Sequence, residues 1–411
     1  MNFNLDGAAK QVIADLRELA SLTSDEKGAQ RVAWTPVWQK ARTWFADKAR
    51  QSGAAISIDP AGNTWATIKG KSDDSVIIGS HIDCVPNGGW LDGALGVVVT
   101  LEILRRYGIN EEKPTKTIHA VNWADEEGAR FGVSLTGSSA VSGDLEVDRI
   151  INFTDNDGNK MRDVLAQYNV KLENMLQANQ EFKKHNVTAS LELHIEQGPV
   201  LENQGKDVAC VYGITGVERH YIKFTGQAAH AGSFPTEMRQ DAFLAAAKSA
   251  LAFREIALKH KGVCTVGKVK VHPDVVTIVP DECVISLDQR SIDKDVLAKM
   301  YSEAKEATQK FAKQDNVKVE WSKIWTIAPT LFDKELVEAC KQAVKEETGE
   351  PTTIYSGPLH DSAELAKLVP TVMMFAVSQR GLSHCKEEDT PEPKLETAIR
   401  AFMRLVHKVV M

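Results

Sequence analysis

Histidine and carboxylate residues stand at or just beyond the ends of several apolar runs in this sequence of 411 residues. In GSHIDCV, His81 and Asp83 lie two residues apart after a short apolar run, so an extended backbone places both side chains on one face. A metal-bound imidazole needs its second ring nitrogen held, which a nearby carboxylate can do. We therefore expect His81 to be a metal ligand oriented by Asp83. An ordinary surface or core histidine is the alternative.

Carboxylates follow at two further places. Asp92 lies in NGGWLDG, where glycines allow the backbone to turn tightly around a bound ion. Asp125, Glu126 and Glu127 come directly after the apolar part of TIHAVNWADEE. Three adjacent carboxylates at a buried strand end repel one another and lose hydration, so they need a positive charge among them. This pattern favours a metal cluster, with an exposed acidic turn as the alternative.

Two more histidines complete the set of metal-ligating residues. His194 lies near the end of a strand-like run in LELHIEQG, and His384 follows an apolar run in GLSHCKEED. Histidine with carboxylate and without thiolate suits zinc, manganese, cobalt or nickel. Polar residues beyond the carboxyl ends of parallel strands gather at one edge of a sheet. The sequence therefore predicts a metal site at that edge.

The elements that must position these residues alternate between strand and helix. Helices are predicted over 6–22, 36–52, 95–107, 333–347 and from about 393, and strands over 75–81, 117–127, 352–355 and 370–377. Such alternation is typical of an α/β domain with a largely parallel central sheet.

A different pattern begins near residue 212. The predicted order is a strand over 219–226, a helix over 239–258, strands over 263–272 and 283–290, a helix over 294–313 and a strand over 317–321. This βαββαβ order is that of a ferredoxin-like open-faced sandwich. We predict a discontinuous metal-binding domain of residues 1–211 and 327–411, with a smaller domain of residues 212–326 inserted into it.

Composition argues against several classes of protein. The net charge is −7 and the charges are interspersed, so we expect no binding to nucleic acid or to an anionic membrane. The sequence shows neither an export signal nor a run of apolar residues long enough to span a membrane, which predicts a cytoplasmic protein. Six cysteines without CxxC spacing argue against a disulfide framework. Small molecules are the expected partners.

Eight motifs in one order resemble the amidase branch of the M20 family. They are GSHID, GGWLDG, DEEGARF, HIEQG, HAG, the DQR of 288–290, SGPLHD and GLSH. This branch contains N-carbamoyl-L-amino-acid hydrolases, allantoate amidohydrolases and β-ureidopropionases, and the resemblance extends from about residue 6 to 409. It implies a large catalytic α/β domain with two metal ions and an inserted ferredoxin-like domain that acts as a lid and in dimerisation.

The resemblance also implies how the metal ligands are shared. One ion would be held by His81, Asp92 and His194, and a second by Asp92, Glu127 and His384, so that Asp92 bridges the two. Two divalent ions can activate a water molecule and polarise a substrate carbonyl. The ions expected are zinc, manganese, cobalt or nickel.

Further residues acquire roles from the same resemblance. Glu126 would be the general base that later passes its proton to the leaving amine. His230 would stabilise the oxyanion in the site of a partner subunit, which implies a homodimer. Arg290 would bind the substrate α-carboxylate, with an ion pair to Asp288 as the alternative. Gln197 would contact the ureido group.

His360 would line the pocket, and the departures from the family pattern lie near such substrate-binding positions. Thr277 stands where asparagine is common, and Pro358 and Leu359 replace smaller residues in SGPLHD. The segment SHNPAE or SHSPAE of relatives is SHCKEE here. The expected metal ligands and Glu126 match the family, so these departures favour an unusual substrate over an inactive enzyme.

The resemblance therefore implies hydrolysis of an N-carbamoyl-L-amino acid to the amino acid, carbon dioxide and ammonia. Allantoate amidohydrolase, β-ureidopropionase and N-acyl-amino-acid hydrolase activities are the alternatives within the same chemistry. A metal-binding dimer without catalysis is a remote alternative. The presence of Glu126 argues against it, because a protein that only binds metal needs no base beside the water.

Overall fold

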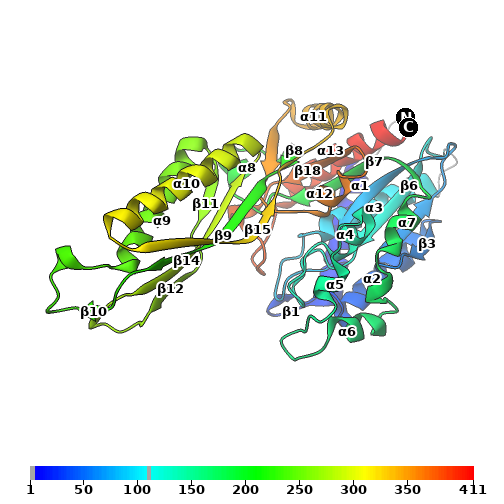
Figure 1. Cartoon of the computed structure of the whole chain (residues 1–411). Coiled ribbons are helices and arrows are strands. Elements are labelled where there is room, and N and C mark those ends of the chain that lie inside the picture. The colour runs from blue at the N-terminus through cyan, green and yellow to red at the C-terminus, as the bar shows by residue number, and fades with distance from the viewer. Residues whose placement is uncertain (1–4, 109–112) are drawn as a thin grey trace. The chain divides into compact units, whose positions relative to one another are not determined.

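The computed structural model describes residues 5–108 and 113–411, and the chain divides into two units. The larger unit comprises Met1–Tyr212 and Phe332–Met411, and the smaller unit comprises Gly213–Leu331. Within the described residues, no helix is long and apolar enough to cross a membrane. Figure 1 shows the elements of both units.

A mixed sheet forms the centre of the larger unit. Its middle strands run in the order β18-β7-β5-β6 and are parallel to one another. At the two sides, β8 pairs antiparallel with β18, β4 pairs antiparallel with β6, and β3 pairs antiparallel with β4. The strands are β3 (Ala55–Ile58), β4 (Thr64–Ile68), β5 (Asp74–His81), β6 (Thr117–Trp123), β7 (Asn186–Ile195), β8 (Val208–Ile214) and β18 (Thr371–Ala376). The predicted α/β fold with a largely parallel centre is confirmed.

Helices cover the sheet and close its core. They include α1 (Leu5–Thr23), α2 (Pro36–Gln51), α3 (Ala94–Gly108), α11 (Lys334–Thr348) and α13 (Glu392–Val410). Residues 75–81 of β5 are buried throughout, as expected of a parallel strand covered on both faces. Helix α3 packs closely on β5 and β7. The approach at Gly96 leaves no room for a side chain, since a Cβ added there would lie 2.4 Å from the Leu193 carbonyl oxygen.

Two features of the larger unit differ from the sequence predictions. The strand predicted over 117–127 ends at Trp123, because the backbone turns at Asp125, which has a φ of 58°. Between Thr136 and Phe182 the chain forms short helices that the apolar periodicity did not indicate. They are α4 (Thr136–Ser142), α5 (Val147–Ile150), α6 (Met161–Gln167) and α7 (Gln177–Phe182).

The smaller unit consists of an antiparallel sheet and two helices. The sheet runs in the order β11-β14-β9-β15, with β12 also paired to β14. Its elements are β9 (Gly216–Thr225), α9 (Ala242–His260), β11 (Val263–Thr265), β12 (Val269–His272), β14 (Glu282–Ser291), α10 (Lys294–Gln314) and β15 (Lys318–Ile327). Burial alternates along β14, so one face of the sheet is covered and the other is solvated. Figure 1 shows α9 and α10 side by side on this unit.

Candidate metal centre

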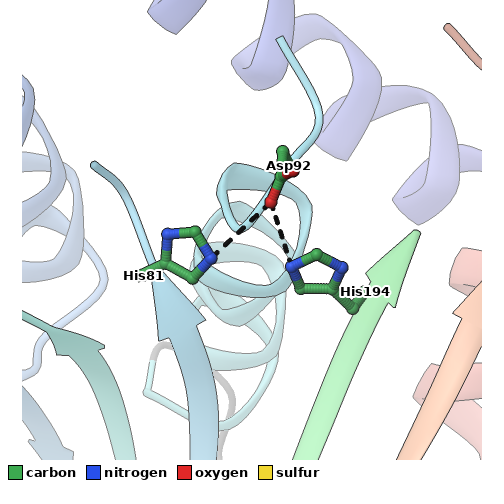
Figure 2. Close-up of side chains that lie close together, drawn as sticks. All are labelled: His81, Asp92 and His194. Carbon is green, nitrogen blue, oxygen red and sulfur yellow. Dashed lines mark ion pairs between the residues drawn. The ribbon is translucent and has the colours of Figure 1, made fainter. Parts of the chain in front are cut away.

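Neighbouring parallel strands bring the first group of candidate ligands together. His81 is the last residue of β5, and His194 is the last but one of β7, so both lie at the carboxyl edge of the sheet. Asp92 precedes α3. Its Oδ1 lies 3.7 Å from Nε2 of His81 and 3.2 Å from Nε2 of His194. Figure 2 shows both imidazoles pointing toward this carboxylate.

Backbone carbonyls orient the two imidazoles. Nδ1 of His81 lies 3.1 Å from the Asp83 carbonyl oxygen, and Nδ1 of His194 lies 2.9 Å from that of Ile195. A carbonyl oxygen can only accept a hydrogen bond, so each Nδ1 carries the hydrogen. In the neutral imidazole each Nε2 then carries a lone pair, as a metal ligand requires. Nε2 of His194 also accepts the backbone N–H of Gly93 at 3.2 Å.

The second oxygen of Asp92 faces another group. Its Oδ2 lies 3.4 Å from Nε2 of His384, and the same nitrogen lies 3.4 Å from Oε2 of Glu127. The other oxygen of Glu127, Oε1, is buried and has no hydrogen-bond partner among the described residues. The two oxygens of Asp92 thus point into two separate clusters of potential ligands, His81–Asp92–His194 and Asp92–Glu127–His384.

The electrostatics of this buried site fit the binding of cations. Burial raises the pKa of Glu127 to about 7, and the negative Asp92 adds to this shift. Burial also raises the pKa of Glu126 well above its usual range, with Glu127 and Asp361 contributing repulsion. Burial lowers the pKa of His81 to about 3, so this ligand is neutral at pH 7. Hydrogen bonds to Asp92 raise the pKa values of His194 and His384 to about 9, although burial opposes both shifts. Buried carboxylates crowded beside imidazoles, with one buried oxygen unpaired, are a donor set that fits divalent ions.

Glu126 lies beside these clusters without belonging to either of them. Its Oε2 is 3.6 Å from Nε2 of His81, and the residue is 8% exposed. The Asp83 carboxylate accepts the backbone N–H groups of Glu126 and Glu127 at 3.4 and 3.2 Å. Its nearer oxygen is 3.8 Å from Nδ1 of His81. The sequence predicts that this carboxylate orients His81, but the Asp83 carbonyl makes the closer contact, and the carboxylate holds the backbone of the acidic segment.

Asp125, the first of the three adjacent carboxylates, turns away from the candidate ligands. Its Oδ2 accepts the indole N–H of Trp34 at 2.7 Å, and its φ of 58° directs the chain away from the strand. Burial raises the pKa of this carboxyl to about 6. A local reversal of the backbone therefore divides the predicted cluster of three acids into one structural residue and two residues of the site.

Two predicted substrate contacts also lie beside the ligands. The side chain of Gln197 donates from Nε2 to Oδ2 of Asp92 at 2.7 Å. The ring of His360 is buried, and its centroid is 4.5 Å from that of His194. Nε2 of His360 lies 3.0 Å from the Ser356 hydroxyl. Both side chains are thus positioned within the same group of residues as the candidate ligands.

A third cluster, Glu192–His194–His360, is compact enough to hold an ion, but two of its residues are engaged in other contacts. Nδ1 of His194 already donates to a carbonyl, and its Nε2 faces Asp92. Glu192 accepts the hydroxyls of Ser80 and Ser362 at 2.7 and 2.6 Å. Its carboxylate therefore connects β5, β7 and the segment after His360, and we assign it a structural role.

The remaining predicted residues lie in the smaller unit. His230 is exposed, and its Nδ1 accepts the backbone N–H groups of Gly232 and Ser233 at 3.1 and 3.2 Å. Nε2 therefore carries the hydrogen in the neutral imidazole and is available as a donor. Thr277 is exposed, and its carbonyl oxygen accepts the N–H of Ala231 at 2.8 Å.

Arg290 forms the ion pair that the sequence allowed as an alternative. Its Nε donates to Oδ1 of Asp288 at 2.9 Å, and Arg219 on the neighbouring strand donates to Oδ2 of the same carboxylate. Burial alone would raise the pKa of Asp288, but the two guanidinium groups lower it. The side chain of Arg290 is 30% exposed.

Sequence reasoning did not identify Glu388 as part of the site. This residue is 1% exposed, and its Oε1 accepts the backbone N–H groups of Leu91 and Asp92 at 3.0 and 2.9 Å. Its Oε2 accepts the Ser383 hydroxyl at 2.9 Å. In the sequence Glu388 lies in the charged run KEED, which resembles an exposed loop. Its place as the last residue of the SHCKEE segment was the only available signal.

Comparison with known proteins identifies the family. The sequence pattern of peptidase family M20/M25/M40 matches residues 77–408. The chain belongs to this family. An M20 relative, the N-carbamoyl-L-amino acid amidohydrolase of Geobacillus stearothermophilus, is 33% identical over 369 residues, which cover 88% of each chain. The allantoate amidohydrolase of Escherichia coli K12 is 29% identical over 95% of each chain.

A similar solved structure supports the fold. The amidase of the hydantoinase/carbamoylase family from Burkholderia multivorans has a TM-score of 0.89 and 29% sequence identity, with 98% of each chain covered. This M20 protein is therefore an amidohydrolase, a hydrolase that acts on carbon–nitrogen bonds other than peptide bonds.

Proposed function

We propose that the protein hydrolyses the carbamoyl amide of an N-carbamoyl-L-amino acid to the amino acid, carbon dioxide and ammonia. The observation that carries this proposal is the orientation of Asp92. Each of its two oxygens faces a different cluster of potential ligands, with Glu126 beside them and outside both. The relative from Geobacillus stearothermophilus, which carries this activity in its name, is similar over 88% of its length.

His81, Asp92 and His194 would hold one divalent ion, and Glu127 and His384 would complete a second site around Asp92. When bound, two such ions polarise a carbonyl and acidify a water molecule. We propose zinc, manganese, cobalt or nickel, because imidazole and carboxylate ligands suit these ions.

Glu126 is the base in this proposal. Its carboxylate takes the proton from the attacking water and later delivers it to the leaving nitrogen. Asp83 keeps Glu126 in place through the backbone N–H of that residue. The buried surroundings of Glu126 raise its pKa, which favours proton uptake during the reaction.

Roles in substrate binding are proposed for five further residues. Gln197 and His360 would contact the ureido group and line the pocket, and Arg290 would bind the α-carboxylate. His230 would stabilise the oxyanion through the N–H of Nε2 in the site of a partner subunit. Thr277 would lie at the substrate-binding position where relatives commonly have asparagine.

A homodimer is part of this proposal. Leu244, Leu251 and Leu258 of α9 are 44%, 70% and 57% exposed and follow one another at intervals of seven residues. An apolar stripe with this spacing suits packing against a second helix. A cytoplasmic location remains a prediction from the sequence.

Ammonia release from a panel of substrates tests the proposed function. The panel contains several N-carbamoyl-L-amino acids, allantoate and N-carbamoyl-β-alanine, with N-acetyl-L-amino acids as controls that release no ammonia. We expect the highest kcat/KM for an N-carbamoyl-L-amino acid.

Other outcomes of the panel would favour other functions. Preference for allantoate would favour an allantoate amidohydrolase, the second candidate, which the similarity to the Escherichia coli enzyme supports. Cleavage of the N-acetyl compounds alone, measured as free amino acid, would contradict both. Metal binding without any turnover would favour a non-catalytic dimer.

A further inference from the structure

The two proposed ion sites differ in how firmly their ligands are held. His81 and His194 lie on strands, are 1% exposed, and each has its Nδ1 bound to a backbone carbonyl. His384 lies on a loop with a φ of 58°, and its side chain is 48% exposed. A ligand on a loop depends on the residues that fix the loop. The second site therefore depends on the anchoring of the segment 381–391.

Glu388 anchors this segment against the backbone of the bridging ligand. One carboxylate oxygen accepts the N–H groups of Leu91 and Asp92 at 3.0 and 2.9 Å. The contact is close enough to exclude a side chain at position 89, because a Cβ added to Gly89 would lie 2.2 Å from the Glu388 carboxylate. This contact joins two loops that are 296 residues apart in the sequence.

Ser383 extends the contact to the ligand atoms. Its hydroxyl lies 2.9 Å from Oε2 of Glu388 and 2.7 Å from Oδ2 of Asp92. Oδ2 is the oxygen of Asp92 that faces His384, and Ser383 directly precedes His384 in the chain. Glu388 and Ser383 therefore help to position Oδ2 of Asp92 and the side chain of His384, which both belong to the second site.

We propose that Glu388 is a positioning residue that sets the affinity of the second ion site. The inference rests on the proposed function, because it requires two ions. Glu388 contacts no reacting atom in this proposal and acts by holding Asp92 and Ser383. Loss of such an outer partner typically weakens metal binding about 10- to 100-fold. The first site changes less, since two of its three proposed ligands, His81 and His194, are oriented by backbone carbonyls that Glu388 does not contact.

A metal titration tests this role. The metal-free full chain is titrated with Co²⁺, and binding is monitored by calorimetry and by visible absorption. The variant Glu388→Gln keeps the shape of the side chain and removes its charge. Glu387→Gln removes the same charge from the adjacent exposed residue and is the matched control. We expect two Co²⁺ ions in the wild type, a second ion bound about 10- to 100-fold more weakly in Glu388→Gln, and wild-type affinities in the control.

Several outcomes would overturn the role of Glu388. Wild-type affinities for both ions in Glu388→Gln would do so, as would equal weakening of both sites together with a lower thermal midpoint, which indicates a purely structural role. If Glu388→Gln does not fold, Ser383→Ala replaces it, and an unchanged second-site affinity there would contradict the inference. A wild type that binds fewer than two ions would instead remove the proposed function, and this inference with it.

Discussion

At the scale of single residues, two of the three candidate imidazole ligands are oriented by backbone carbonyls of their own segments. His81 donates to the carbonyl of Asp83, and His194 to that of Ile195, its direct neighbour. The ring orientation of each ligand is therefore set locally, so it survives changes elsewhere in the chain. The carboxylate of Asp83 is left to hold the two glutamates that follow β6.

Replacement of Glu126 by glutamine tests its role as base. The amide has nearly the same shape but accepts no proton, so we expect turnover to fall by about 10² to 10⁴-fold while metal content stays at the wild-type level. Activity and metal content are measured on the same sample, with the exposed Glu26→Gln as the control. Turnover within a few-fold of the wild type would exclude Glu126 as the base.

The buried side chain of His119 should make the free energy of unfolding depend on pH. It is 2% exposed on β6, its Nδ1 lies 2.9 Å from the Thr67 hydroxyl, and burial with the nearby His185 lowers its pKa to about 3. The unfolded chain has the ordinary histidine pKa of about 6.5. Between about pH 3 and pH 6.5, His119 binds a proton in the unfolded state but not in the folded state. The free energy of unfolding is therefore highest above about pH 6.5 and decreases as the pH falls below this value.

The variant His119→Gln removes this titration. We expect the free energy of unfolding of the wild type to fall more steeply below pH 6.5 than that of the variant, by up to about 1.4 kcal/mol per pH unit. Urea unfolding of the metal-free proteins from pH 5 to 7.5 measures the two slopes. The exposed His272→Gln is the control, and equal slopes in His119→Gln and the wild type would contradict the prediction.

At the scale of elements, the close approach of α3 to the sheet aligns the strand ends that carry the histidines. A Cβ at Gly96 would lie 2.4 Å from the Leu193 carbonyl oxygen and 2.6 Å from Cβ of Ser80. Ser80 and Leu193 directly precede His81 and His194. The packing of one helix is therefore coupled to the spacing of two candidate ligands.

Gly96→Ala should disturb both stability and the first metal site. Crowding at a packed contact costs about 1–3 kcal/mol, which outweighs the better helix propensity of alanine. We expect a lower free energy of unfolding and weaker binding of the first ion, measured by urea unfolding and by metal titration. Gly357→Ala serves as the control, since a Cβ there would meet no atom within 4 Å. Wild-type stability in Gly96→Ala would show that the helix shifts without cost.

At the scale of the whole molecule, metal binding is expected to couple to folding. An ion that binds only the folded state stabilises it by about 2.7 kcal/mol at a concentration 100 times its dissociation constant. We expect a chelator to abolish turnover and to lower the thermal midpoint, and manganese, cobalt, nickel or zinc to restore both. Full activity in a sample shown to be free of metal would contradict the proposed chemistry.

The exposed leucines of α9 predict the oligomeric state. A charge at Leu251, the most exposed of the three, should oppose the association of two apolar stripes. We expect light scattering to give a dimer for the wild type and a monomer for Leu251→Glu. Ile58→Glu, at a residue of similar exposure on β3, is the control. A monomeric wild type at tens of micromolar would exclude the proposed dimer.

Much of the larger unit could be predicted because its signals are local. Apolar runs indicate β5, β7 and β18, and the histidines at the ends of β5 and β7 and in the loop after β18 are recognisable as candidate ligands. Glu388 could not be recognised, because its partners Leu91 and Asp92 lie almost 300 residues away and are backbone groups that carry no sequence signal. The sequence predicts the Asp83 carboxylate as the partner of His81, whereas the Asp83 backbone carbonyl makes the closer contact. Residue types alone do not distinguish these two oxygens.

The sequence by itself determined the α/β class, the candidate ligands and the family, because strand periodicity and motif order are properties of neighbouring residues. Only the tertiary structure decided which atoms meet. It directed the two oxygens of Asp92 toward different histidines and turned Asp125 toward Trp34. The physical reason is that these outcomes depend on backbone direction at turns and on contacts between distant segments, and both arise only when the elements pack.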